Sequence, residues 1–218
     1  PEIDYCVLGE GEQKLVNSGV TIKMGEGIPI SSSIVQVNIN DDTYEIGTKK
    51  IIIATGSKPT ALSTIPFELD TIVSPDDIFE SHSIPERVFI MGSGGNACEI
   101  AHFYQMLGSK VFLGDNEPRL FSGQDPDISN AIEKILKSLK IKLLLGKKIS
   151  SYYKNNDLLD ISLAEGIKFQ VDKIILNLSR QANSESLNCD TLGIRVGGGK
   201  EIFVNEKFET TVPGIFAV

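Results

Sequence analysis

The sequence lacks several features that would place it in whole classes of protein. It has no tryptophan, and its three cysteines, Cys6, Cys98 and Cys189, are odd in number and far apart. They form neither a disulfide framework nor a CxxC metal pattern, so we expect no metal site. No apolar run approaches the roughly 18 residues that a membrane-spanning helix needs, and the N-terminal residues do not resemble a signal peptide. We therefore expect a cytoplasmic protein with no membrane partner.

Basic residues are also scarce. Lysine and arginine total 21 against 29 aspartates and glutamates, for a formal net charge of -8 and a pI near 4.9. A nucleic-acid partner normally needs a basic face, so the charge balance argues against one. The hydrophobic fraction of 41% is typical of globular proteins. A length of 218 residues allows one large domain or two small ones, at roughly 100–200 residues each.

The N-terminal part of the chain has the pattern of a strand-rich region. Residues 1–27 predict the end of a helix, closed by Gly19, and then a strand over 20–27 where apolar and polar residues alternate. The polar cluster 40–42 predicts the turn of a hairpin. The three consecutive isoleucines at 51–53 predict a strand that is buried on both faces.

Residues 87–145 carry the clearest pattern. Three short runs, RVFIMG, KVFLGD and IKLLLG, alternate with two segments of helical periodicity. The second helix is expected to begin with Asp125 as N-cap and Pro126 at its first position. Its predicted apolar stripe comprises Ile128, Ala131, Ile132, Ile135, Leu136 and Leu139. This order predicts an α/β fold with a Rossmann-like, doubly wound parallel sheet, and residues 151–179 predict an antiparallel β-meander after it.

A glycine-rich loop joins the first of these strands to the first helix. It matches G-x-G-x-x-G/A, and an acidic residue ends the second strand about 20 positions further on, a context that indicates dinucleotide binding. Gly92 would permit the tight turn, Gly94 would let a pyrophosphate approach the helix N-terminus, and Ala97 would let the helix pack closely. The predicted site residues are Gly92, Ser93, Gly94, Gly95, Asn96, Ala97 and Asp115.

The acidic residue also favours NAD over NADP. The Asp115 carboxylate would accept hydrogen bonds from the adenosine ribose and would repel a 2′-phosphate, while Arg119 has no second arginine beside it. Gly95 and Asn96 are unusual, because most such loops place larger apolar residues there. A glycine turn that binds no ligand is the alternative interpretation.

Five segments occur in an order that resembles successive landmarks of the flavoprotein pyridine nucleotide-disulfide oxidoreductases, most of all dihydrolipoamide dehydrogenase. They are KKIIIATGSKP, VFIMGSGGNACEIA, GSKVFLGDNEPRLF, LNLSRQANSESL and TTVPGIFAV. The resemblance implies a partial second dinucleotide-binding domain, which binds FAD, over residues 1–78. It implies an NAD-binding domain over 79–200 and a return strand into the FAD-binding domain over 201–218.

The resemblance also implies roles for further residues. The ATG motif, which ends at Gly56, would lie along FAD, and Glu99 would support a lysine next to the flavin. Arg180 would match the arginine of a GR-x-P-N segment in which Ser179 replaces the glycine and Ala182 the proline. The additional expected cofactor-binding residues are Gly27, Thr55, Gly56, Ser57, Glu99, Ile149, Ser179 and Arg180.

The family chemistry implied by this resemblance passes electrons between a dithiol such as dihydrolipoamide and NAD, through FAD and a cysteine pair. The sequence has no CxxxxC pair, no first glycine loop for FAD and no His-Glu pair; its only histidines are His82 and His102. Cys98 is expected to pack as a small hydrophobe. We therefore expect a central portion of a homodimeric enzyme, with no catalytic residue of its own and inactive alone.

Two alternatives remain open. The parent enzyme could be a mercuric, glutathione or coenzyme-A-disulfide reductase, or a soluble transhydrogenase. The chain could instead be a catalytically silent dinucleotide-binding module, which the departures at Ser179, Ala182, Gly95 and Asn96 favour.

Overall fold

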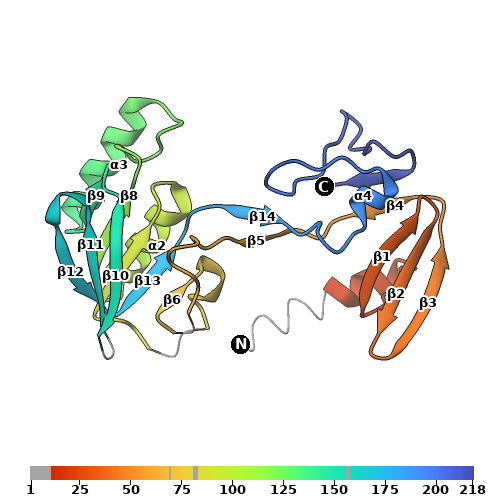
Figure 1. Cartoon of the computed structure of the whole chain (residues 1–218), viewed down its shortest axis with the longest axis horizontal. Coiled ribbons are helices and arrows are strands. Elements are labelled where there is room, and N and C mark those ends of the chain that lie inside the picture. The colour runs from red at the N-terminus through yellow and green to blue at the C-terminus, as the bar shows by residue number, and fades with distance from the viewer. Residues whose placement is uncertain (1–10, 69, 81–82, 156–157) are drawn as a thin grey trace. The chain divides into compact units, whose positions relative to one another are not determined.

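The computed structural model describes residues 11–68, 70–80, 83–155 and 158–218 (Figure 1). The chain divides into two compact units. Unit 1 comprises Pro1–Gly56 and Ala182–Val218, and unit 2 comprises Ser57–Gln181. The divisions thus fall at 56/57 and 181/182, whereas the sequence suggested 78/79 and 200/201. The strands β5 (Ser57–Pro59) and β14 (Arg180–Ala182) pair with each other where the chain passes between the units.

Unit 2 is built on a five-stranded sheet whose neighbouring strands are all parallel. Its strands, in spatial order, are β6 (Ile72–Val73), β13 (Lys173–Leu176), β7 (Arg87–Met91), β8 (Lys110–Asp115) and β9 (Lys142–Leu145). A single-turn 3-10 helix, η1 (Pro75–Asp77), follows β6. The three strands predicted between residues 87 and 145 are β7, β8 and β9, and the predicted fold class is confirmed.

Helices α2 (Gly95–Met106) and α3 (Pro126–Ser138) pack on one face of this sheet, against side chains that include Val88 and Ile90 of β7. The Asp125 carboxylate accepts a hydrogen bond from the backbone N–H of Asp127 at 2.9 Å and caps α3, as predicted. The apolar stripe of α3 is only partly buried. Ile128 and Ile135 are 46% and 56% exposed, because the helix turns only its Leu136 side fully onto the sheet.

An antiparallel meander covers the opposite face of the sheet, but it ends at Val171. The prediction that it continues to residue 179 is wrong, because β13 pairs in parallel with β6 and β7 and so belongs to the main sheet. The meander comprises β10 (Ile149–Asn155), β11 (Leu158–Leu163) and β12 (Lys168–Val171), with a 3-10 turn, η2 (Ala164–Gly166), between the last two. Phe169 of the meander stacks on Phe112 of β8 at 4.6 Å between ring centroids and meets Phe89 of β7 edge-on at 5.3 Å. Alternate residues of β7 therefore enter the helix core and the meander core.

Unit 1 contains a three-stranded antiparallel sheet of β1 (Glu26–Ser31), β2 (Ile34–Ile39) and β3 (Asp42–Gly47). The predicted hairpin turn lies between β2 and β3, where Asn40 adopts a φ of 52°. Residues 11–17 are helical, and Gly19 follows with a φ of 83°, as expected of a helix end. The strand predicted over 20–27 is wrong, since β1 begins only at Glu26. The apolar residues that alternate with polar ones before β1 do not form a buried face, since Met24 is 77% exposed.

A second sheet of unit 1 pairs β4 (Ile51–Ile53) in parallel with β15 (Ile215–Ala217), beside the short helix α4 (Cys189–Leu192). Ile51 and Ile53 are buried in a core with Leu187, but Ile52 is 69% exposed. The prediction of burial on both faces is therefore wrong, because no described residue covers the Ile52 face.

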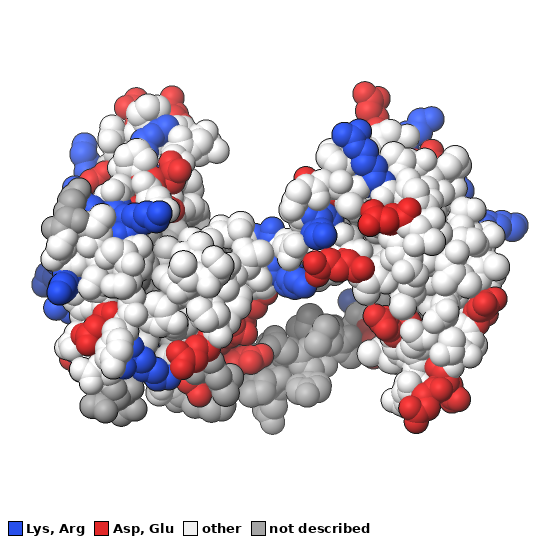
Figure 2. All heavy atoms as spheres, viewed as in Figure 1, with Lys and Arg blue, Asp and Glu red and all other residues white. Residues whose placement is uncertain are grey.

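The surface carries both signs of charge. On the face that Figure 2 shows, lysine and arginine are interspersed with aspartate and glutamate over the described parts of both units. None of the helices within the described ranges is long and apolar enough to cross a membrane.

Candidate functional site

The loop between β7 and α2 makes a turn that only glycine can occupy. Gly92 has a φ of 142°, and a Cβ there would lie 2.3 Å from the backbone oxygen of Asn177. Its N–H donates to the carbonyl of Gly114 at 2.9 Å. The loop is therefore held against the ends of both neighbouring strands, β13 and β8.

The N-terminus of α2 is open. Gly94 is its N-cap, no side chain caps it, and a Cβ at this exposed position would meet nothing within 4 Å. The unpaired N–H groups of a first helical turn attract anions. Ala97 is fully buried one turn in, and its Cβ would be 3.3 Å from a Cβ at position 92, so strand and helix pack closely. This geometry is compatible with the roles predicted for Gly92, Gly94 and Ala97, which stay predictions.

These residues border a depression of about 430 Å³ at the carboxyl end of the parallel sheet. It is lined by Gly92, Ser93, Gly94, Gly95, Asn96, Asp115, Asn177 and Leu178. The chain runs from β7 to β8 and β9 on one side and returns as β13 on the other, so the depression lies at the topological switch point, where such sheets bind ligands. Sequence reasoning missed Asn177 and Leu178, whose available signal was their place directly after the buried run KIIL.

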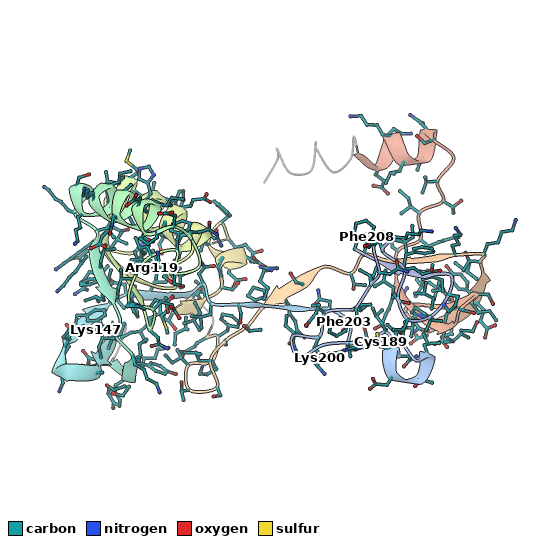
Figure 3. The ribbon with its side chains drawn as sticks, turned by 90° about the horizontal axis from the view of Figure 1, so that it is seen from above. Arg119, Lys147, Cys189, Lys200, Phe203 and Phe208 are labelled. Atoms are coloured by element: carbon teal, nitrogen blue, oxygen red, sulfur yellow. The ribbon has the colours of Figure 1, made fainter. Side chains whose placement is uncertain are left out.

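Asp115 ends β8 at one side of the depression. It is half-buried, and its Oδ1 accepts a hydrogen bond from the N–H of Glu117 at 3.2 Å. Arg119 lies beside α3 (Figure 3), where it donates to Ser129 Oγ at 2.8 Å and to the carbonyl of Ser122 at 2.6 Å. These bonds hold the guanidinium on α3. The open helix N-terminus, the depression and the carboxylate together fit a dinucleotide.

The loop after β8 also explains the unusual Gly95. Phe121 has a φ of 50°, and its N–H donates to the carbonyl of Ser93 at 2.9 Å. The Phe121 ring approaches to 3.5 Å from where a Cβ of Gly95 would lie. The aromatic ring thus occupies the space into which a larger side chain at position 95 would extend.

The structure does not bring all the predicted residues to this depression. Ile149 lines a separate cavity of about 630 Å³ with Thr64, Ile65 and Tyr152. Gly27 lies in β1 of unit 1, where a Cβ would make only an ordinary contact with Val35 at 3.6 Å.

Thr55 and Gly56 also belong to unit 1. Thr55 Oγ1 donates to the carbonyl of Asn183 at 2.7 Å, and the Asn183 amide donates to the Thr55 carbonyl at 3.0 Å. Thr55 and Gly56 line a depression of about 300 Å³ beside the carboxyl ends of β4 and β15, together with Ile53, Phe208 and other residues of unit 1. Within the part of unit 1 that is described, no glycine-rich helix N-terminus borders this depression. Its residues therefore fit an apolar group better than a pyrophosphate.

Arg180, Ser57 and Ser179 make contacts within the chain. Arg180 donates to the Ser57 hydroxyl at 2.8 Å and to both carboxylate oxygens of Asp76, at 2.8 and 3.1 Å. The ion pair with Asp76 raises the pKa of the guanidinium. Ser179 accepts from Thr60 through its backbone carbonyl, at 2.9 Å from the hydroxyl. These bonds tie the β5 and β14 segments to η1.

The two described cysteines, Cys98 and Cys189, are both free thiols. Burial raises the pKa of the Cys98 thiol to about 11, which suits a packed hydrophobe. Glu99 and His102 are exposed on α2. Cys6 and His82 lie outside the described residues. No cluster of three potential metal ligands occurs among the residues that the structure describes.

A family model described as pyridine nucleotide-disulphide oxidoreductase matches residues 7–218. The chain belongs to this family. The resemblance inferred from the sequence is therefore confirmed. A dihydrolipoyl dehydrogenase of Thermus scotoductus is 30% identical over 100% of this chain, which covers 50% of that relative. A mercuric reductase of Staphylococcus aureus is also 30% identical, over 91% of this chain and 36% of the relative. The chain spans about half the length, or less, of these relatives.

Two solved structures share the fold of this chain. LpdA from Mycobacterium tuberculosis superposes with a TM-score of 0.90 at 20% identity, over 99% of this chain and 49% of that one. The HOCl-induced flavoprotein disulfide reductase RclA from Escherichia coli gives a TM-score of 0.81 at 22% identity, over 91% of this chain and 45% of that one.

Proposed function

We propose that unit 2 binds NAD(H) on behalf of an FAD-dependent disulfide oxidoreductase. In the whole protein, electrons would pass between a dithiol such as dihydrolipoamide and NAD through the flavin and a cysteine pair. The homodimer and the cytoplasmic location expected from the sequence belong to this proposal. The catalytic groups are not among the candidate residues of this chain, which contributes cofactor binding.

The observation that carries the proposal is the wedged turn at Gly92, whose Cβ position lies 2.3 Å from the Asn177 carbonyl. This turn directs the uncapped N-terminus of α2 into the depression at the switch point. The N–H groups of α2 would bind the pyrophosphate, and the Asp115 carboxylate would accept hydrogen bonds from the adenosine ribose hydroxyls. NAD(H), once bound, supplies or accepts the hydride.

FAD is assigned to the whole protein on the strength of the family. Thr55 and Gly56 would contact an apolar part of the cofactor, because the depression that they line is mainly apolar. Ser57 and Arg180 would act indirectly through the Asp76 ion pair, which holds the segment after the ATG motif in place.

A second candidate keeps the cofactors and changes the substrate. The mercuric reductase is as similar in identity as the dihydrolipoyl dehydrogenase of Thermus scotoductus, and a soluble pyridine nucleotide transhydrogenase of Colwellia psychrerythraea is 29% identical. Reduction of a substrate other than a lipoyl disulfide therefore stays a candidate.

Calorimetric titration with NADH and NADPH tests the proposal. We expect saturable binding of NADH and weaker binding of NADPH, because the Asp115 carboxylate would repel a 2′-phosphate. Absence of NADH binding would refute the proposed function. Equal affinities for NADH and NADPH would refute only the preference for NAD and would leave the proposed function standing.

A further inference from the structure

Two asparagines are hydrogen-bonded to each other in the depression of the proposed site. Asn96 occupies the second position of α2, and Asn177 is the first residue after β13. The Asn96 Nδ2 donates a hydrogen bond to the Asn177 Oδ1 at 3.0 Å. Both residues line the depression of about 430 Å³. The pair thus connects two elements on opposite sides of the switch point, although the residues are 81 positions apart.

The backbone of Asn177 is fixed on two sides. Its N–H donates to the carbonyl of Met91 at 2.9 Å, and its own carbonyl lies against Gly92. Asn96 is fixed by the first turn of α2. The carboxamides therefore meet in a defined orientation, and this orientation leaves functional groups unused.

The hydrogen bond decides which groups remain for a ligand. Because the Asn177 Oδ1 accepts from Asn96, the amide nitrogen of Asn177 retains two N–H donors. Asn177 lines the same depression as the first residues of α2. The two N–H donors of Asn177 suit an oxygen-rich ligand. An apolar side chain at position 96, as most glycine loops have, would not orient them.

The position of the Asn96–Asn177 pair indicates which half of a dinucleotide would lie beside it. Asp115 lies at the β8 side of the depression, where the adenosine ribose is expected. Asn177 lies at the β13 side, across β7 from Asp115. A dinucleotide with its pyrophosphate at the N-terminus of α2 would extend its other half along β13.

We propose that Asn177 is a positioning residue for the nicotinamide half of NAD(H), and that Asn96 orients its carboxamide. This inference rests on the proposed function, since it takes the ligand to be a nicotinamide dinucleotide. The Asn177 N–H groups would donate to oxygen atoms beyond the pyrophosphate.

The test compares NADH with 5′-ADP, which has the adenosine and the diphosphate but no nicotinamide half. Both are titrated calorimetrically into the unmodified chain and into Asn177→Ala, Asn96→Ala and Asp115→Ala. We expect Asn177→Ala to weaken NADH about fivefold, the effect of losing one neutral hydrogen bond, and to leave ADP unchanged. Asp115→Ala is the matched control and should weaken both ligands.

Two further variants separate positioning from structural support. Asn177→Asp keeps the acceptor for Asn96 but replaces the donors with a negative charge, so NADH should bind more weakly than to Asn177→Ala. Asn96→Ala should cost about twofold, and the double alanine variant should cost no more than Asn177→Ala, because Asn96 acts through Asn177. Unchanged thermal melting without ligand would show that each variant folds.

The outcomes distinguish the inference from the function on which it rests. If NADH does not bind to the unmodified chain, the proposed function fails and the inference with it. If NADH binds but Asn177→Ala has no effect, only the inference is wrong. A loss of ADP affinity equal to that of NADH would move Asn177 to the pyrophosphate and overturn the assignment to the nicotinamide half.

Discussion

Two short aliphatic strands, one in each unit, have similar sequences and different surroundings. The residues of β13, KIIL in unit 2, are all buried, because α2 and α3 cover one face of its sheet and the meander covers the other. The three isoleucines of β4 in unit 1 alternate between buried and exposed. A run of aliphatic residues therefore predicts a strand but does not determine whether both of its faces are covered.

The depression of unit 2 and the depression of unit 1 also have similar positions and different surroundings. Each lies at the carboxyl ends of parallel strands, as ligand sites in α/β sheets do. The depression of unit 2 has a glycine turn, an open helix N-terminus and a carboxylate. The depression of unit 1 is mainly apolar in its described residues. Anion binding is therefore expected in unit 2 and apolar contact in unit 1.

The largest expected effect comes from replacing a buried strand residue in unit 2, compared with an exposed strand residue in unit 1. Phe89→Ala removes a 1% exposed ring that packs on Phe169, so the free energy of unfolding should fall by about 3–5 kcal/mol. Ile52→Ala should change it by less than about 0.5 kcal/mol, as at most exposed positions. Urea unfolding followed by circular dichroism measures both. A large loss for Ile52→Ala would mean that its face is covered in solution.

Two glycines of the same loop should respond differently. Gly92→Ala places a methyl group against the Asn177 carbonyl at a φ of 142°, which should cost about 2–4 kcal/mol and abolish NADH binding. Gly94→Ala meets no atom within 4 Å, so stability should change by about 1 kcal/mol or less. Thermal melting and NADH titration check the pair. Equal destabilisation by the two variants would contradict the wedged turn.

Each unit has a buried cysteine, and the rate at which its thiol is alkylated should depend on pH. Burial raises the pKa of Cys98 to about 11 and also raises that of Cys189. Because alkylation requires the thiolate, Cys98 should react about 100-fold more slowly at pH 8 than a thiol of pKa 9. Its rate should rise until the pH approaches 11. Peptide mass mapping after iodoacetamide treatment measures each site, with the urea-unfolded chain as control. Rapid labelling of folded Cys98 would contradict its burial.

Coenzyme choice gives a smaller effect. Asp115→Ala removes the acceptor for the ribose hydroxyls and the charge that repels a 2′-phosphate. The preference for NADH over NADPH should shrink by about tenfold, or roughly 1.4 kcal/mol. Calorimetry with both cofactors measures this, and Glu117→Ala serves as a nearby charge control. If both variants narrowed the preference equally, the effect would come from net charge alone.

Local signals predicted most of unit 2. The strands β7, β8 and β9, the N-cap at Asp125 and the glycine turn all follow from short patterns in the sequence. Burial within unit 1 did not follow, because exposure of Ile52 depends on which segments cover a sheet. The burial of α3 was also overestimated, since its stripe did not show which side, at Leu136 or at Ile135, faces the sheet.

The predicted site was incomplete for a similar reason. The glycine loop and Asp115 carry a recognised spacing, whereas Asn177 depends on a contact with Asn96 across 81 positions. The resemblance predicts Arg180 at a cofactor, and this stays a prediction. Its ion pair with Asp76 does not follow from the sequence, because no local pattern links these two positions. The roles of Asn177 and Arg180 both depend on contacts between segments that are far apart in the sequence.

The smallest expected effect compares the N-caps of one helix in each unit. The Asp125 carboxylate caps α3, so Asp125→Ala should lower the free energy of unfolding by about 1 kcal/mol. Asn188 precedes α4 with a φ of 52° and makes no side-chain cap bond. Asn188→Gly should therefore be neutral or slightly stabilising, because glycine adopts this backbone conformation without steric cost. Urea unfolding of the two variants decides, and a loss at position 188 as large as that at 125 would show that the Asn188 side chain stabilises α4.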